Sequence, residues 1–109
     1  AGAAAVRLVG DPDLPVRGLA FATETSRPNA LAPLLARPDV HLVIAGEVHE
    51  TETTAYVLDA IALGMPKALL LLGSLEMEEA PARALADWLA EQLTVPVRYL
   101  PTPEILTAV

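Results

Sequence analysis

An imidazole and three carboxylates follow an apolar stretch in the middle of the chain, within the segment GEVHETETT at residues 46–54. The four side chains are Glu47, His49, Glu50 and Glu52. Histidine nitrogens and carboxylate oxygens bind divalent metals, and the same groups exchange protons in acid–base catalysis. Acids in the first turn of a helix are also stabilised by the helix dipole, and a solvated histidine there needs no further role. The residues alone leave both interpretations open.

A second acidic group follows the apolar run KALLLLG, in the segment SLEMEE at residues 74–79. On a helix, Glu76 and Glu79 share a face and could hold one hard cation, whereas Glu78 points elsewhere. Ser74 could cap this helix, and it could act as a nucleophile only with a base beside it, which the sequence does not identify. For this segment alone, an acidic first helical turn is the simpler interpretation.

The remaining polar features have little functional weight. The segment GDPDLP has the composition of a turn, and His41 lies inside an apolar stretch. A hydrogen-bonded core or interface histidine is favoured at that position over a metal ligand. The sequence contains no glycine-rich phosphate loop, no Gly-x-Ser-x-Gly motif and no neighbouring pair of histidines.

The elements that must position these residues follow from the apolar periodicity. It predicts strands at residues 4–9, 16–23, 40–46, 67–73 and 95–101, and helices at residues 29–37, 50–63 and 77–93. Both acidic stretches directly follow a predicted strand, where open α/β sheets usually place function. We predict a single α/β domain over residues 1–109, with a mixed, partly parallel sheet of about five strands and three helices packed on it.

Charge and composition narrow the classes of partner. The chain has fourteen acidic and seven basic residues, which gives a net charge of -7, and Lys67 is the only lysine. Without a basic patch the chain lacks electrostatic attraction to nucleic acid or anionic membranes, so we expect neither as a partner. The absence of cysteine excludes disulfides and Cys-type zinc sites, and a cytoplasmic location is the default. The 53% hydrophobic content favours burial against copies of the same chain. The chain begins at Ala1 without methionine, from which we expect a processed, trimmed or subcloned fragment.

The last seventy residues also keep a register of glycines, acids and aromatic residues. It consists of Ala45, Gly46 and Glu47 after one strand, Gly64 near the end of a helix, Gly73 after the next strand, then Glu78 and the Leu-x-x-Trp-Leu group Leu85, Trp88 and Leu89. This register resembles the C-terminal part of the Nif-three-like family, dinuclear metal-centre proteins often named type-two-like GTP cyclohydrolases. The upstream segment VRLVGDPDLPVRGLAFAT looks like the part that enters this half of the family's fold.

The resemblance implies a Nif-three-like half-domain, assembly into rings of subunits, and a divalent metal such as zinc, manganese or iron. In the family, the His and Glu of a Gly-His-x-x-Ser/Thr-Glu motif bind metal, together with a His-His pair and an Asp from the N-terminal half. Here Ser74 stands where the His belongs and Met77 where the Ser or Thr belongs, so only Glu78 matches a ligand. A hydroxyl is a poor substitute for imidazole toward a transition metal.

We therefore hypothesise a Nif-three-like domain that is degenerate or partial at the metal site and serves assembly or the binding of a ligand or partner. Two alternatives stay open. The chain could be a fragment of a metal-dependent hydrolase whose N-terminal half supplies the missing ligands, so whether it is an enzyme is undecided. It could instead be a small-molecule or protein-binding module that uses Glu47, His49 and Glu50 as its recognition edge.

Overall fold

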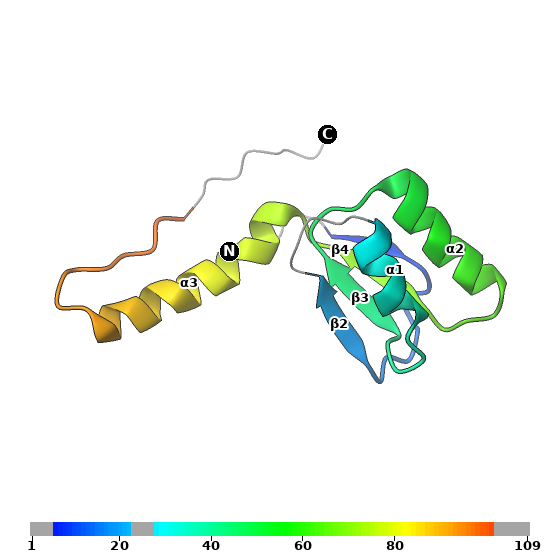
Figure 1. Cartoon of the computed structure of the whole chain (residues 1–109), viewed down its shortest axis with the longest axis horizontal. Coiled ribbons are helices and arrows are strands. Elements are labelled where there is room, and N and C mark those ends of the chain that lie inside the picture. The colour runs from blue at the N-terminus through cyan, green and yellow to red at the C-terminus, as the bar shows by residue number, and fades with distance from the viewer. Residues whose placement is uncertain (1–5, 23–27, 102–109) are drawn as a thin grey trace.

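The computed structural model describes residues 6–22 and 28–101, with the side chains of Pro28 and of residues 74–76 outside that description. It contains the predicted mixture of strands and helices (Figure 1). In chain order these are β1 (Arg7–Val9), β2 (Leu19–Ala22), α1 (Pro28–Ala36), β3 (Leu42–Ala45), the π-helical turn η1 (Glu50–Thr54), α2 (Ala55–Ala62), β4 (Ala68–Leu71) and α3 (Ser74–Gln92). The α/β class is therefore confirmed.

The strands form one mixed sheet in the order β1-β4-β3-β2. Strands β2, β3 and β4 are parallel, and β1 pairs antiparallel with β4. Parallel neighbours need a crossover connection, which α1 supplies between β2 and β3, and η1 with α2 supplies between β3 and β4. The alternation of apolar strands and helical segments in the sequence thus predicted the partly parallel pairing correctly.

The predicted fifth strand is wrong. Residues 95–101 form no strand in the described part of the chain, and the described sheet has four strands instead of about five. Pro96 and Pro101 have no backbone N–H to donate to a neighbouring strand. The segment instead turns back beside α3 (Figure 1), where the guanidinium of Arg83 lies 4.8 Å from the centre of the Tyr99 ring.

The core lies on one face of the sheet, beneath α1 and α2. Paired residues of neighbouring strands point to the same side, so Val43 and Leu69 share this face. Both are fully buried, as are Leu31 and Leu35 of α1 and Val57 of α2. The crossovers from β2 to β3 and from β3 to β4 run in the same direction across the sheet. The helices of both crossovers, α1 and α2, therefore cover the same face and form a single core with it.

The opposite face of the sheet is equally apolar, but none of the helices in the described part of the chain covers it. We call it the open sheet face. The pairing register places on it the buried Ala68 together with Leu8, Leu19, Phe21, Leu42, Ile44 and Leu70. Phe21 is 59% exposed, and Leu8 and Leu19 are exposed as well. A sheet of this composition is normally covered on both faces, so the open sheet face is the main departure of this fold from a layered α/β domain.

Helix α3 leaves the sheet instead of packing on it, so the prediction of three packed helices is wrong for this element (Figure 1). The chain reaches 55 Å along its longest axis, and its radius of gyration is 16.4 Å, against about 13 Å for a compact chain of this length. Helical spacing places Ala84, Leu85, Trp88 and Leu89 on one side of α3, and this apolar row is largely exposed. We call these four residues the α3 stripe. None of the helices in the described part of the chain combines the length and apolar composition needed to cross a lipid bilayer.

Candidate functional site

The two acidic stretches begin side by side at the carboxyl edge of the sheet. Strands β3 and β4 are parallel neighbours, so both end at this edge. The N–H of Leu72 donates to the carbonyl of Ala45 at 2.9 Å, and the N–H of Gly73 donates to the carbonyl of Gly46 at 2.8 Å. Gly73 has φ 93°, a conformation that favours glycine and turns the chain from β4 into α3. The expectation that both stretches follow strands is confirmed.

The first stretch forms the loop after β3 and the π-helical turn η1. The side chains of Glu47, His49, Glu50 and Glu52 are all exposed. His49 is extended at the start of the turn, and its carbonyl accepts hydrogen bonds from the N–H groups of Glu52 and Thr53 at 3.1 and 2.8 Å. Its imidazole makes no capping hydrogen bond. The backbone of His49 therefore organises this turn, while its side chain faces solvent.

Glu50 is the one acid of this stretch with a charged partner among the described contacts. Its Oε1 atom lies 2.9 Å from Nη1 of Arg7 on β1. Both side chains are mostly exposed, and ion pairs of that kind contribute little stability. The contact links the start of η1 to the antiparallel edge strand, and it competes with a role for Glu50 in binding a cation.

The second stretch is less completely described, because the side chains of Ser74 and Glu76 lie outside the described residues. Glu78 is exposed on α3, and Glu79 accepts a hydrogen bond from Nη2 of Arg83 at 3.2 Å. Across the described residues, no group of three or more His, Cys, Asp or Glu side chains could hold a metal ion. The metal site expected at Glu47, His49, Glu50, Ser74 and Glu78 therefore stays a prediction.

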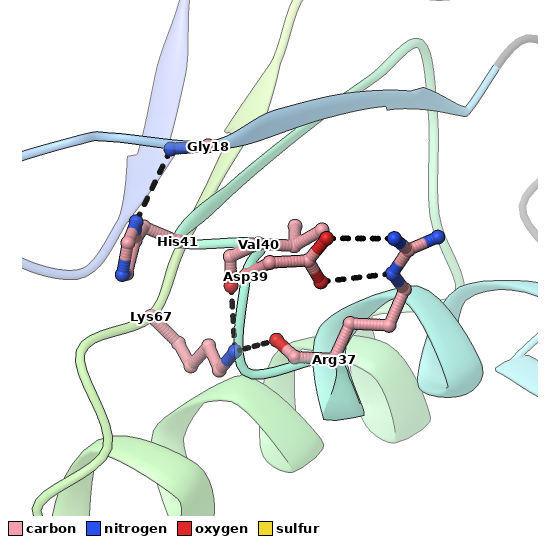
Figure 2. Close-up of polar contacts among 6 residues, drawn as sticks. All are labelled: Gly18, Arg37, Asp39, Val40, His41 and Lys67. Atoms are coloured by element: carbon pink, nitrogen blue, oxygen red, sulfur yellow. Dashed lines mark hydrogen bonds and ion pairs between the residues drawn. The ribbon is translucent and has the colours of Figure 1, made fainter.

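The opposite, amino edge of the sheet carries a polar junction that the sequence did not reveal (Figure 2). Lys67 precedes β4 and is only 3% exposed. Its Nζ atom donates to the carbonyl oxygens of Arg37 and Val40, each at 2.6 Å. Carbonyls at the end of a helix lack intrahelical partners, and Lys67 satisfies that of Arg37, which directly follows α1. The one available signal was a single lysine placed directly before an apolar strand.

Arg37 and Asp39 form a two-point ion pair at the surface of the same junction (Figure 2). Nε and Nη2 of Arg37 lie 2.9 and 2.7 Å from the two carboxylate oxygens of Asp39. The hydrogen bonds from Arg37 lower the pKa of Asp39, and partial desolvation opposes this effect. The same hydrogen bonds raise the pKa of Arg37. The pair holds the loop between α1 and β3 in place.

His41 is a structural residue of this junction, as the sequence indicated. Its Nδ1 atom accepts hydrogen bonds from the backbone N–H groups of Arg17 and Gly18, at 3.2 and 3.3 Å. Two donors at Nδ1 require that atom to be unprotonated, so the neutral ring carries its hydrogen on Nε2. The N–H of His41 in turn donates to the carbonyl of Gly18 at 2.8 Å. These contacts join the starts of β2 and β3 (Figure 2).

Fold and edges together define a small α/β domain with helices on one face of a mixed sheet and an acidic carboxyl edge. Comparison with protein-family models, with curated proteins and with solved structures gives no match to this chain. The Nif-three-like resemblance therefore rests on the sequence register of Gly46, Gly73, Glu78 and Trp88.

Proposed function

We propose that this chain is an assembly domain, a degenerate or partial Nif-three-like half-domain that joins copies of itself. The observation that carries the proposal is the open sheet face, a continuous apolar surface with no covering layer in the described part of the chain. Exposed apolar patches of this kind mark interaction sites in soluble proteins. Burying a side chain that is now about half exposed, such as Phe21 or Leu19, contributes on the order of 1 kcal/mol each.

The α3 stripe provides a matching surface. A helix of 19 residues is about 28 Å long, and four strands spaced about 4.8 Å apart are roughly 14 Å wide. One α3 is therefore long enough to cross the whole open sheet face. Because α3 leaves its own sheet at the Gly73 turn, it can lie on the sheet of a second copy, whose α3 returns the contact by two-fold symmetry.

The area at stake is close to that of a stable interface. Phe21 and Trp88, with Leu8, Leu19 and Leu85, are each between two-fifths and three-fifths exposed. Together they present on the order of 500 Å² of apolar surface per copy, most of the roughly 800 Å² that each partner contributes to a standard interface. The net charge of -7 on each copy opposes association, so added salt should strengthen the dimer by screening this repulsion.

Sedimentation analysis of single variants tests the proposal. Leu85→Ser removes an α3 side chain that is 55% exposed, and Leu58→Ser is its matched control, a leucine of α2 that is 53% exposed. We expect a dimer for the unaltered chain and for Leu58→Ser, and a monomer for Leu85→Ser and Phe21→Ser. A monomeric unaltered chain, at all accessible concentrations and salt levels, would contradict assembly through these surfaces.

Because the chain has no cysteine, disulfide trapping identifies what covers the open sheet face. A mixture of Phe21→Cys and Trp88→Cys chains should form a covalent heterodimer under mild oxidation, and a mixture of Phe21→Cys and Leu58→Cys chains should not. Cross-linking within a single doubly substituted chain would show that α3 folds back on its own sheet. That result would overturn the exchange of α3 between copies.

A second candidate function is a metal-dependent hydrolase completed by chain outside this sequence. It is favoured by the adjacency of Gly46 and Gly73, which brings the family-matched Glu47 and Glu78 stretches to one edge of the sheet. Elemental analysis after exposure to zinc, manganese and iron separates the two functions. Two tightly held ions per chain would favour the hydrolase, whereas a metal-free dimer would favour assembly. We propose a cytoplasmic location in either case, as the default for this chain.

A further inference from the structure

A cavity of about 220 Å³ lies between α1 and the segment formed by η1 and α2. Its described lining consists of Ala32, Leu35, Glu52, Thr53 and Tyr56. The volume exceeds the roughly 150 Å³ of an engineered apolar cavity that accepts benzene in another protein. The cavity is on the helix side of the sheet, away from the open sheet face, so occupation of this cavity does not depend on assembly through that face.

Thr53 gives the cavity wall an unsatisfied polar group. The residue is 2% exposed, and its Oγ1 atom has no hydrogen-bond partner in the described part of the chain. Most buried side-chain polar atoms in proteins have a partner, because burying a hydroxyl without one is unfavourable. The hydroxyl is therefore an unpaired hydrogen-bonding group in a residue of the cavity lining, and because Oγ1 itself is covered, a rotation about the Cα–Cβ bond presents it to a ligand.

The local backbone sets Thr53 apart from the helix that comes after it. Residues Glu50–Thr54 form a π-helical turn, after which the chain continues as the regular helix α2. Short π-helical segments inside helices are rare and occur often at functional sites. Here the turn places Thr53 in the cavity lining together with Leu35 of α1, while Glu52 beside it stays exposed. A cavity, an unpaired buried hydroxyl and a π-helical turn thus coincide at one residue.

We infer that this cavity binds a neutral molecule of about the size of benzene that carries one hydroxyl group, with the Thr53 hydroxyl as its hydrogen-bond partner. Leu35 and Ala32 give an apolar wall, and Tyr56 offers a ring for edge or face contact. The carboxylate of Glu52 and the net charge of -7 oppose an anionic ligand. The apolar lining in turn disfavours a fully charged cation in place of the neutral molecule.

Titrations of the whole chain followed by amide chemical shifts in NMR spectra test this inference with phenol, benzene and benzoate as probes. Phenol should bind two- to tenfold more tightly than benzene, the range expected for one hydrogen bond, and benzoate should bind most weakly. The amides of Leu35, Thr53 and Tyr56 should shift, whereas those of Phe21 on the open sheet face should not. Equal binding of phenol and benzene, or no binding of either, would overturn the inference.

The matched variants are Thr53→Val, which removes the hydroxyl and keeps the shape, and Thr54→Val in the same turn, which does not line the cavity. Thr53→Val should bind benzene as before and lose the preference for phenol, while Thr54→Val should keep it. Ala32→Leu, which fills the cavity, should abolish binding of both probes. A phenol preference that persists in Thr53→Val would assign the hydrogen bond to another group and contradict the inference, even if Ala32→Leu fails to fold.

Discussion

The two faces of the sheet are built from the same kinds of residue and have opposite surroundings. On β4, Leu69 is completely buried under the helices, while its neighbour Leu70 points to the open sheet face and is only partly covered. On β3 the same contrast separates Val43 from Ile44. Neither face can be recognised from composition, because both rows of side chains are apolar. The difference arises from the crossover connections, which place α1 and α2 on one side only.

The largest expected effect contrasts the two faces directly. Leu69→Ala should lower the free energy of unfolding by about 3 to 4 kcal/mol, because it leaves a void among core side chains that cannot rearrange to fill it. Leu70→Ala should cost about 1 kcal/mol or less in dilute monomer, as expected for a partly exposed side chain. Urea denaturation of both variants measures the difference. Similar losses for the two variants would show that the open sheet face is already covered in solution.

A somewhat smaller effect concerns the close approach between β2 and the loop that leads into β3. A Cβ atom on Gly18 would lie 1.8 Å from the carbonyl oxygen of Asp39, which is backbone and cannot move aside freely. Gly18→Ala should therefore cost about 2 to 3 kcal/mol of stability through forced displacement.

Gly64→Ala is the control for this substitution. Gly64 has φ +83° but nothing within 4 Å of an added Cβ atom, so its cost should be limited to backbone strain of about 1 kcal/mol. The midpoints of thermal unfolding of the two variants show which substitution costs more stability. If Gly64→Ala lowered stability more than Gly18→Ala, the close approach of Gly18 to the carbonyl of Asp39 would not be an important constraint on the fold.

A substitution of Lys67 tests how much its hydrogen bonds stabilise the position of α1 on the covered face of the sheet. Lys67→Met keeps the length of the side chain and removes the hydrogen bonds to the carbonyls of Arg37 and Val40. The carbonyl of Val40 loses its Nζ donor, and the carbonyl of Arg37 keeps only the N–H of Val40 at 3.2 Å. We therefore expect a loss of about 1 to 2 kcal/mol. Arg17→Met, which removes an exposed cation nearby, should change stability by less than about 0.5 kcal/mol. Equal effects in urea denaturation would indicate that loss of positive charge, rather than loss of the hydrogen bonds, controls stability here.

The smallest expected effect is a pH dependence of the Arg37–Asp39 pair. The folded state lowers the pKa of Asp39 through its hydrogen bonds with Arg37, so the pair stabilises the fold at pH values above the ordinary aspartate pKa of about 3.9. This contribution is lost as the pH falls through the lowered pKa of the folded state.

Asp39→Asn measures this contribution. The variant should lose a little stability at neutral pH and should resemble the unaltered chain in strong acid, with the difference reduced by salt because the pair is exposed. A stability gap between the two chains that does not narrow on acidification would contradict the ion pair as the source. Comparing Asp39→Asn with Lys67→Met also separates the stability contributed by the exposed ion pair from that contributed by the buried hydrogen bonds of Lys67.

Much of the fold could be predicted from particular residues. The near-continuous apolar run at residues 40–46 contains β3, and the helical periodicity after Glu50 gives η1 and α2, although no sequence signal distinguishes the π-helical turn from an α-helix. The alternation of Val95, Val97 and Tyr99 led to the wrong prediction of a strand at residues 95–101. Alternation in the sequence does not show whether a neighbouring strand is close enough to pair with the segment. The two acidic stretches were found, because charged residues after an apolar run are visible in the sequence.

The sites that were missed are defined by partners far away in the chain. Lys67 makes hydrogen bonds about thirty residues back along the chain, and Thr53 borders a cavity whose other wall is α1. Neither residue belongs to a motif, and a lysine or a threonine beside an apolar run is usually exposed. Their burial depends on how α1 lies across the sheet, which local patterns do not specify.

The sequence by itself determined the α/β class, the approximate places of four strands and three helical regions, the acidic edge and the absence of cysteine chemistry, because these depend on local periodicity and residue type. The tertiary structure alone decided which face of the sheet is covered, where α3 points, and which polar groups are buried. Those features depend on contacts between segments distant in sequence, whose free energies come from burial and from shared hydrogen bonds rather than from any one residue.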